Sequence, residues 1–203
     1  MYAVGHFALG YLTGKVTAEA LDVDINLPLV FLASVFPDID ILIPGLEHRG
    51  PLHSVLLFCL VFIPIFTVYR KRAAPYFVAL IQHIIIGDFI VGGDLQLLWP
   101  LSTSAYGLEV GMGSALHIAL EWSLFLVSMA VMIKTSDIRL FFKPDSLNRI
   151  LAIPVMTVLL PTVISFPLYV PLSLLIPHII YLILLAGSIF VDWKAILTKA
   201  KAQ

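Results

Sequence analysis

The stretch LHSVLLFCLVFIPIFTVY, residues 52–69, decides the fold class. It is an uninterrupted apolar run close to the roughly 20 residues that a helix needs to cross the hydrocarbon core of a bilayer. The rest of the chain has the same character, with 60% hydrophobic and 12% charged residues and a mean hydropathy of +1.02. A soluble domain carries about a quarter charged residues. The sequence therefore predicts an all-α, polytopic helical membrane protein.

Other apolar stretches flank this run on both sides. They cover roughly residues 2–19, 26–45, 74–91, 112–133, 148–168 and 171–191. Polar residues interrupt the first two, so we expect those two to be partly re-entrant, with irregular backbone covered by protein or water. The last five stretches have the character of ordinary spans. We predict one integral membrane domain over residues 1–203, with about five to seven membrane segments.

The basic residues are concentrated on connections that alternation places on one side of the membrane. Ten of the twelve lie there: Arg70, Lys71, Arg72, Lys134, Arg139, Lys143, Arg149, Lys194, Lys199 and Lys201. Lysine and arginine favour cytoplasmic connections. We therefore expect a multi-pass protein of the inner (cytoplasmic) membrane, with a cytoplasmic C-terminus and with residues 38–53 and 88–111 outside. The acidic connection 19–24 does not follow this rule, which leaves the topology before residue 50 open.

Composition also excludes some classes of protein. The net charge of −1 provides no basic surface for nucleic acid. The single cysteine, Cys59, rules out an intrachain disulfide framework. Neither feature indicates an oligomeric state.

The ionisable residues within the apolar segments are concentrated before Trp99. Such groups are costly in a membrane and usually mark function. Imidazole and carboxylate are ligands for zinc, manganese and iron. The candidate metal ligands are His6, Asp38, Asp40, His48, His53, His83 and Asp88. They exceed what one ion needs, so we predict two or more divalent ions, zinc first and manganese or iron as alternatives. Residues 1–100 then form the metal-site half of the domain and 101–203 its supporting helices.

The spacing of these residues places conditions on the local backbone. Asp38 and Asp40 are two apart, so they point the same way only if the chain is extended there. His83 and Asp88 are five apart, about 140° around an ideal helix. A π-bulge or Gly87 could bring them together; otherwise they ligate different ions.

The block HRGPLHS, residues 48–54, adds groups that suit a substrate. Pro51 reads as the first residue of a helix, with His53 in its first turn. Arg49 is the only cation among the candidates, and a guanidinium suits bidentate contact with phosphate. We expect Arg49 and Ser54 to contact the substrate, and Asp38 or Asp40 to act as a base as well as a ligand.

Each of these residues also has a purely structural interpretation. Asp38 and Asp40 could be turn or cap residues, and His83 and Asp88 could form a buried hydrogen-bonded pair. His117 and Glu121 are four apart on one helix face, which favours an interhelical hydrogen-bonded pair. Whether they join the metal site stays open.

Taken together, these motifs resemble the YdjM-like family of inner-membrane metal-dependent hydrolases. The resemblance covers about the first half of the chain. It rests on His6 to Gly10, on PDID at 37–40, on HRGPLHS at 48–54, and on His83 and Asp88 before LWP at 98–100. The family is distantly similar to zinc-dependent phospholipases C. The resemblance implies a hydrolase whose ligands are those named above.

The expected function is therefore a membrane-embedded metal-dependent hydrolase, of the phosphoesterase or phospholipase C kind. Metal-bound hydroxide would cleave a phosphoester in a lipid or lipid-linked substrate, because the site lies at a membrane face. Two alternatives remain from the same residues. One is a transporter or channel for a divalent cation or proton, and the other is a non-catalytic scaffold whose metal staples helices together.

Overall fold

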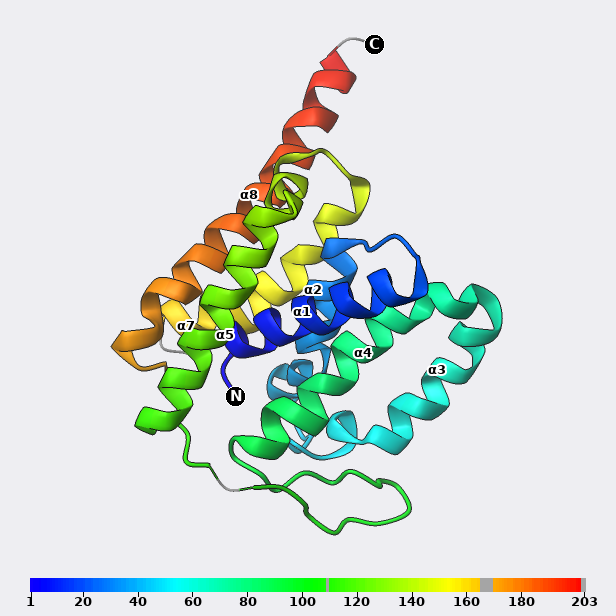
Figure 1. Cartoon of the computed structure of the whole chain (residues 1–203), viewed down its shortest axis with the longest axis vertical. Coiled ribbons are helices and arrows are strands. Elements are labelled where there is room, and N and C mark those ends of the chain that lie inside the picture. Colours follow the sequence, from blue (N-terminus) through cyan, green and yellow to red (C-terminus); the bar gives the residue numbers. More distant parts are fainter. Residues whose placement is uncertain (109, 165–169, 202–203) are drawn as a thin grey trace.

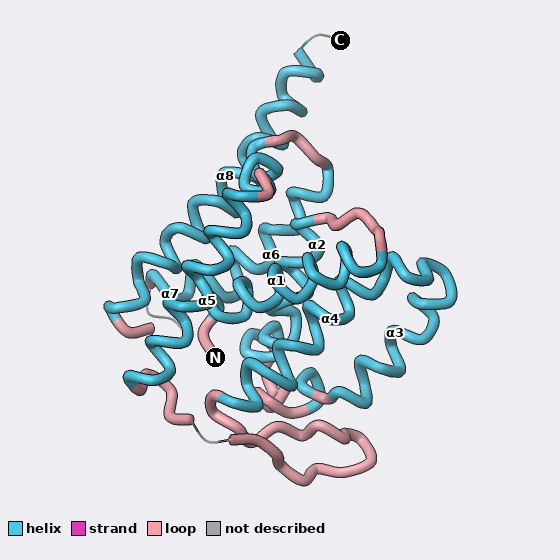
Figure 2. Tube along the Cα trace, viewed as in Figure 1, coloured by secondary structure: helices cyan, strands magenta, loops and turns pink. Residues whose placement is uncertain are grey.

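The computed structural model describes residues 1–108, 110–164 and 170–201, and the predicted all-helical class is confirmed (Figure 1). Within those ranges the only β-type pairings are two isolated bridges, Val91 with Val110 and Leu95 with Tyr106. Both bridges lie at the long loop between α4 and α5, drawn in pink in Figure 2. The fold is therefore a helical bundle with one extended connection.

The elements follow one another as α-helices interrupted by short 3-10 or π-helical turns (η). In the first half they are α1 (Ala3–Leu21), α2 (Leu27–Val35), η1 (Phe36–Leu42), η2 (Pro51–His53), α3 (Val55–Tyr69), η3 (Arg70–Ala73), α4 (Ala74–Gln82) and η4 (His83–Asp88). In the second half they are α5 (Ala115–Lys134), η5 (Asp137–Phe142), η6 (Ser146–Leu151), α6 (Ala152–Pro154), η7 (Val155–Leu159), α7 (Leu160–Val163), η8 (Leu172–Leu174) and α8 (Leu175–Lys201).

Helix α1 runs through the middle of the bundle, where it packs chiefly against α4, α2 and α5 (Figure 1). Its apolar side enters an aromatic cluster. The ring of Phe7 lies 5.4 Å from that of Phe31 and 5.2 Å from that of Tyr181. Tilted aromatic pairs at such distances add about 0.5–1.5 kcal/mol each beyond the area they bury. This core joins α1 and α2 to α8.

A second, smaller apolar cluster holds α3 and α4 together. Phe58 and Phe62 of α3 pack with Leu80 and Ile84, and Leu95 of the long loop covers them. The candidate site lies between the two clusters. Its polar residues therefore come from elements fixed on both sides by packing.

The expected count of five to seven spans is not supported. Among the described residues, two helices are long and apolar enough to cross a bilayer, Ala115–Lys134 and Leu172–Thr198. α3 has 15 residues, about 22 Å of helix, which is short of the roughly 30 Å hydrocarbon core. The 74–91 run becomes π-helical at His83, and the 148–168 run divides into short helical pieces. Apolar composition continues through these runs, but regular helix does not. Residues 165–169, at the expected boundary between the last two spans, lie outside the described residues.

The two ends of the bundle differ in character. η5 and the C-terminal part of α8 lie at one end, and the long loop 92–111 lies toward the other (Figure 1). At the first end, Asp137 accepts a 2.7 Å hydrogen bond from the Tyr11 hydroxyl and lies 3.0 Å from Lys15 Nζ. Burial alone would raise the pKa of the Asp137 carboxyl, but these two partners hold that pKa below its ordinary value.

Candidate metal centre

The PDID segment forms a 3-10 turn, η1, so the condition under which Asp38 and Asp40 would point the same way, an extended chain, is not met. A 3-10 helix has about three residues per turn, so side chains two apart point in different directions. Pro37 stands in the first turn, where a missing N–H costs nothing. As a result the two buried carboxylates approach opposite ring nitrogens of His53, Asp38 the Nε2 and Asp40 the Nδ1.

The HRGPLHS segment begins a helical turn at Pro51, as predicted, and η2 carries His53 into the interior with no exposed surface. Ser54 is also fully buried. Its Oγ accepts from Leu57 N at 3.1 Å and caps α3, while its hydroxyl lies 2.7 Å from the Trp99 carbonyl oxygen. The geometry gives Ser54 this structural task and offers no support for the expected substrate contact.

A π-helical turn from His83 to Asp88 brings these two residues together, which is one of the alternatives that their spacing left open. The turn is wider than an α-helical one, so positions five apart come onto one side. His83 Nε2 lies 3.7 Å from Asp88 Oδ2. Gly87 is required in this turn because a Cβ there would lie 2.5 Å from Cε1 of His6.

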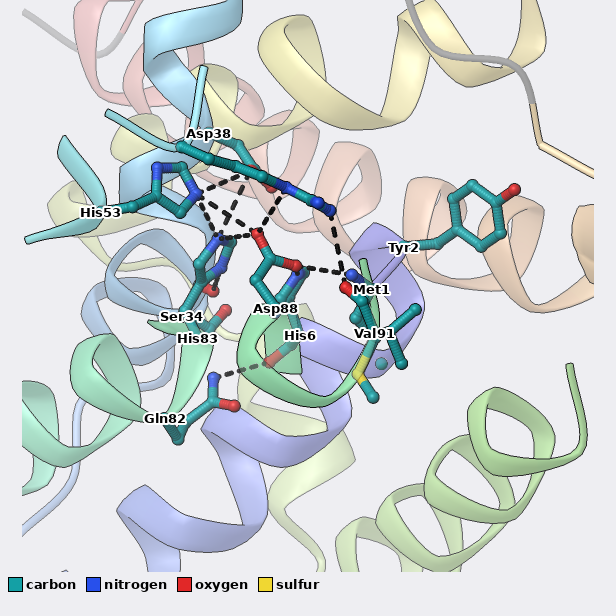
Figure 3. Close-up of polar contacts among 12 residues, drawn as sticks. Met1, Tyr2, His6, Ser34, Asp38, His53, Gln82, His83, Asp88 and Val91 are labelled. Atoms are coloured by element: carbon teal, nitrogen blue, oxygen red, sulfur yellow. Dashed lines mark hydrogen bonds and ion pairs between the residues drawn. The ribbon is translucent and has the colours of Figure 1, made fainter. Parts of the chain in front are cut away.

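Four side chains converge on one point, and we call them the primary group: Asp38, His53, His83 and Asp88. One ligand atom from each lies within 4.8 Å of the others, and all four residues are buried (Figure 3). The Nε2 atoms of His53 and His83 are 3.3 Å apart. His53 Nε2 lies 3.3 Å from Asp88 Oδ2, and His83 Nε2 lies 3.3 Å from Asp38 Oδ1. His53 Nε2 lies 3.8 Å from Asp38 Oδ1.

These separations fit the edges of a metal coordination shell. At zinc–ligand distances of about 2.0–2.1 Å, tetrahedral ligand atoms lie about 3.3–3.4 Å apart. His83 Nδ1 lies 2.8 Å from the Ser34 carbonyl oxygen, a hydrogen bond that assigns this nitrogen as the donor. His53 Nδ1 lies 3.1 Å from Asp40 Oδ2, within ion-pair distance but not aligned as a hydrogen bond. The negative charge of Asp40 favours the proton of His53 on Nδ1, and the same tautomer in both rings leaves the Nε2 lone pairs facing two carboxylates. Lone pairs and negative charges gathered in this way fit a bound cation.

A secondary group consists of Asp40, His48 and His53. His48 Nδ1 lies 2.8 Å from Asp40 Oδ1, and the His48 side chain is 40% exposed. His53 belongs to both groups through its two ring nitrogens. Asp40 can thus serve either as a ligand of a second ion or as the carboxylate that orients His53 toward the primary group, a common partner of metal-bound histidine.

His6 lies against the primary group without being one of its four members. Its ring stacks on His83 at 3.6 Å between centroids, and its Nε2 lies 3.3 Å from Asp88 Oδ1. That contact is within ion-pair distance but is not aligned as a hydrogen bond, so both buried ring nitrogens of His6 lack a hydrogen-bond partner. The amino nitrogen of Met1 also approaches Asp88 Oδ1, at 2.5 Å (Figure 3). His6 is therefore placed to join an ion that Asp88 holds.

Gln82 is a residue at this site that the sequence reasoning missed. It is buried, and its Nε2 donates to the His6 carbonyl oxygen at 3.3 Å (Figure 3). This bond ties α4 to α1 one position before the π-helical turn. The signal available in the sequence was an amide directly before His83 in an otherwise apolar run.

Arg49 lies beside the primary group, at a small cavity of about 40 Å³ that also contacts Asp38, His48 and Asp88. Its Nη1 donates to the Gly93 carbonyl at 3.1 Å, and its Nε lies 3.9 Å from Asp88 Oδ2 without a hydrogen-bond partner. A Cβ at Gly92, whose φ is +99°, would collide with the guanidinium. The cavity has room for a few water molecules.

His117 and Glu121 hydrogen-bond to each other within α5, not between helices as expected, and both lie outside the two groups. His117 Nδ1 accepts from Gly113 N at 3.0 Å, so its Nε2 is the donor to Glu121 Oε1, also at 3.0 Å. Glu121 is fully buried and accepts from the backbone N–H groups of Tyr2 and Gly5, at 2.7 and 2.6 Å. A carboxylate at a helix N-terminus satisfies free N–H groups and the helix dipole. The pair thus anchors the start of α1 one residue before His6.

Comparison with known proteins identifies a family over most of the chain. The sequence model of the family described as YdjM inner membrane protein matches residues 1–169, which include every residue of both groups. No curated protein and no solved structure matches the chain.

Proposed function

The chain belongs to the YdjM inner membrane protein family, and we propose that it is a membrane-embedded metal-dependent hydrolase acting on a phosphoester in a lipid or lipid-linked substrate. The single observation that carries the proposal is the primary group. Two imidazole nitrogens lie 3.3 Å from each other and 3.3–3.8 Å from one oxygen of each of two carboxylates, in a buried site.

Asp38, His53, His83 and Asp88 would hold the first ion, and the secondary group is the place for a second. A divalent cation bound there would supply Lewis-acid activation of water and neutralise charge on phosphate oxygens. Zinc suits this set of nitrogen and oxygen ligands, and manganese or iron can use the same set. The family's inner-membrane character supports integration in a membrane, where a lipid substrate is at hand.

The chain's own residues suit the rest of the reaction. Arg49 borders the cavity and its Nε has no hydrogen-bond partner, so its guanidinium would bind the anionic group of the substrate. Asp38 borders the same cavity and is 7% exposed, whereas Asp40 is 1% exposed and engaged with His48 and His53. We therefore assign the proton-accepting role to Asp38. The cavity is smaller than a phosphate head group, so binding would require its apolar wall, which includes Ile41 and Met112, to move apart.

A metal-stapled scaffold is the second candidate, and one observation favours it. The primary group already supplies four protein ligands, as closed structural zinc sites do, whereas catalytic sites keep a position open. A transport route has no comparable support. Between the site and the far end of α1, the described core is filled by packed rings such as Phe7, Phe31 and Tyr181.

The test uses purified protein loaded separately with zinc, manganese or iron and offered phospholipids with labelled head groups. We expect release of a phosphorylated or free head group by the wild type, and loss of release in His83→Ala and Arg49→Ala. Asp94→Asn is the matched control, because Asp94 is exposed on the long loop and outside both groups. Metal bound with unchanged affinity in Arg49→Ala, together with no release by any loaded wild-type sample, would favour the scaffold.

A further inference from the structure

A second cavity, unrelated to the metal centre, lies between α2, α3 and α4. Its volume is about 600 Å³. Its walls are almost entirely apolar and include Leu29, Leu32, Ala33, Phe58, Val61 and Phe62. At one end of the cavity, Phe36 of η1, directly after α2, meets Phe58 in the first turn of α3, where the two rings are 6.1 Å apart. From Phe58 to Tyr69 the cavity follows α3 for about 16 Å, at about 1.5 Å per residue.

Two opposite charges lie at the other end of this cavity. Asp24 precedes α2 and Arg72 belongs to η3, and both residues are exposed and border the cavity. Within the described part of the chain they form no ion pair with each other. Lys71, the residue before Arg72, is engaged elsewhere, because its Nζ donates a hydrogen bond to the carbonyl oxygen of Leu21 at 2.9 Å. The end of the cavity thus offers one cation and one anion to a ligand.

We propose that this cavity binds a zwitterionic phospholipid with an ammonium head group, one acyl chain lying along α3. The phosphate would contact the Arg72 guanidinium, which suits phosphate oxygens, and the ammonium would contact Asp24. Inside a bilayer an apolar groove gains little from the hydrophobic effect, because the surrounding lipid is equally apolar. Selection of this lipid over others therefore depends on the two charges. The site is independent of the metal centre and of hydrolysis.

The experiment measures which lipid the full-length protein retains. Purified protein in detergent is mixed with equal amounts of phosphatidylethanolamine and phosphatidylglycerol and examined by native mass spectrometry. Ala33→Trp and Val61→Trp fill the cavity from α2 and α3. Leu60→Trp is the matched control, since Leu60 adjoins Val61 but is 52% exposed and outside the cavity.

The wild type and Leu60→Trp should retain one phosphatidylethanolamine in preference to phosphatidylglycerol. Retention should fall about tenfold in the two filling variants and in Arg72→Gln, which loses a charge-assisted contact. Asp24→Asn should reverse the preference toward phosphatidylglycerol, whose head group has no ammonium. Equal retention by Leu60→Trp and both filling variants would overturn the proposal, and so would a head-group preference that Arg72→Gln and Asp24→Asn leave unchanged.

Discussion

Replacing Asp40 by Asn should weaken binding of the first metal ion about 10–100-fold. The primary group should still bind its ion when the metal is saturating. The carboxylate lies 3.1 Å from His53 Nδ1 and is 1% exposed, so water cannot substitute for it. Its charge favours the tautomer that directs the Nε2 lone pair of His53 toward the ion. A neutral amide keeps the shape and removes that bias, which corresponds to about 1.4–2.7 kcal/mol of binding free energy.

The assay is competition with a chelator of known affinity, combined with metal stoichiometry at saturation. Asp38→Asn is the comparison, because it alters a member of the primary group itself and should lower the stoichiometry. Asp94→Asn is the control for a lost carboxylate near the site. If Asp40 instead binds a second ion, Asp40→Asn will lose one ion per chain and leave the affinity of the remaining ion unchanged. An affinity within twofold of wild type with unchanged stoichiometry would refute both roles for Asp40.

The remaining predictions concern residues that support the site or the far end of α1. Gly87→Ala should displace His6, since the added Cβ would lie 2.5 Å from its Cε1, and should weaken metal binding about tenfold; unchanged affinity would show that His6 has no part in the site. Glu121→Gln should lower both thermal stability and metal affinity by loosening the start of α1, and a loss of stability alone would remove the link to the site. Asp137→Asn should destabilise the protein by about 1–2 kcal/mol at pH 7. Because the folded-state pKa of Asp137 is lowered, this difference should shrink as pH falls below about 4, and a thermal-melting difference that is the same at pH 7 and pH 3 would contradict it.

The candidate ligands could be predicted from the sequence because ionisable residues are rare in its apolar runs. The seven predicted ligands come together, from segments up to 82 positions apart, His6 to Asp88. The five-residue spacing of His83 and Asp88 raised a π-helical turn as one alternative, since an ideal α-helix would separate them, and the structure has that turn. The requirement that His83 and Asp88 share one site thus constrains the backbone between them.

Other features could not be predicted because they depend on tertiary packing. A 3-10 turn at Asp38 separates it from Asp40, and nothing in PDID distinguishes that turn from an extended chain. Hydropathy predicted five to seven spans, whereas two helices among the described residues are long and apolar enough to cross a bilayer, because hydropathy measures composition and not helix continuity. The role of Glu121 could not be predicted without the position of α1, because its carboxylate accepts a hydrogen bond from a backbone N–H group at the start of that helix.

The most direct test of the account is the metal content of the protein purified without chelator or added metal, determined by elemental mass spectrometry beside His53→Ala and His83→Ala. Each variant removes one imidazole of the primary group. The account predicts at least one divalent ion per wild-type chain and a loss of that ion in both variants, with circular dichroism showing the helices retained. A wild-type chain that contains no metal and binds none from zinc, manganese or iron would contradict it.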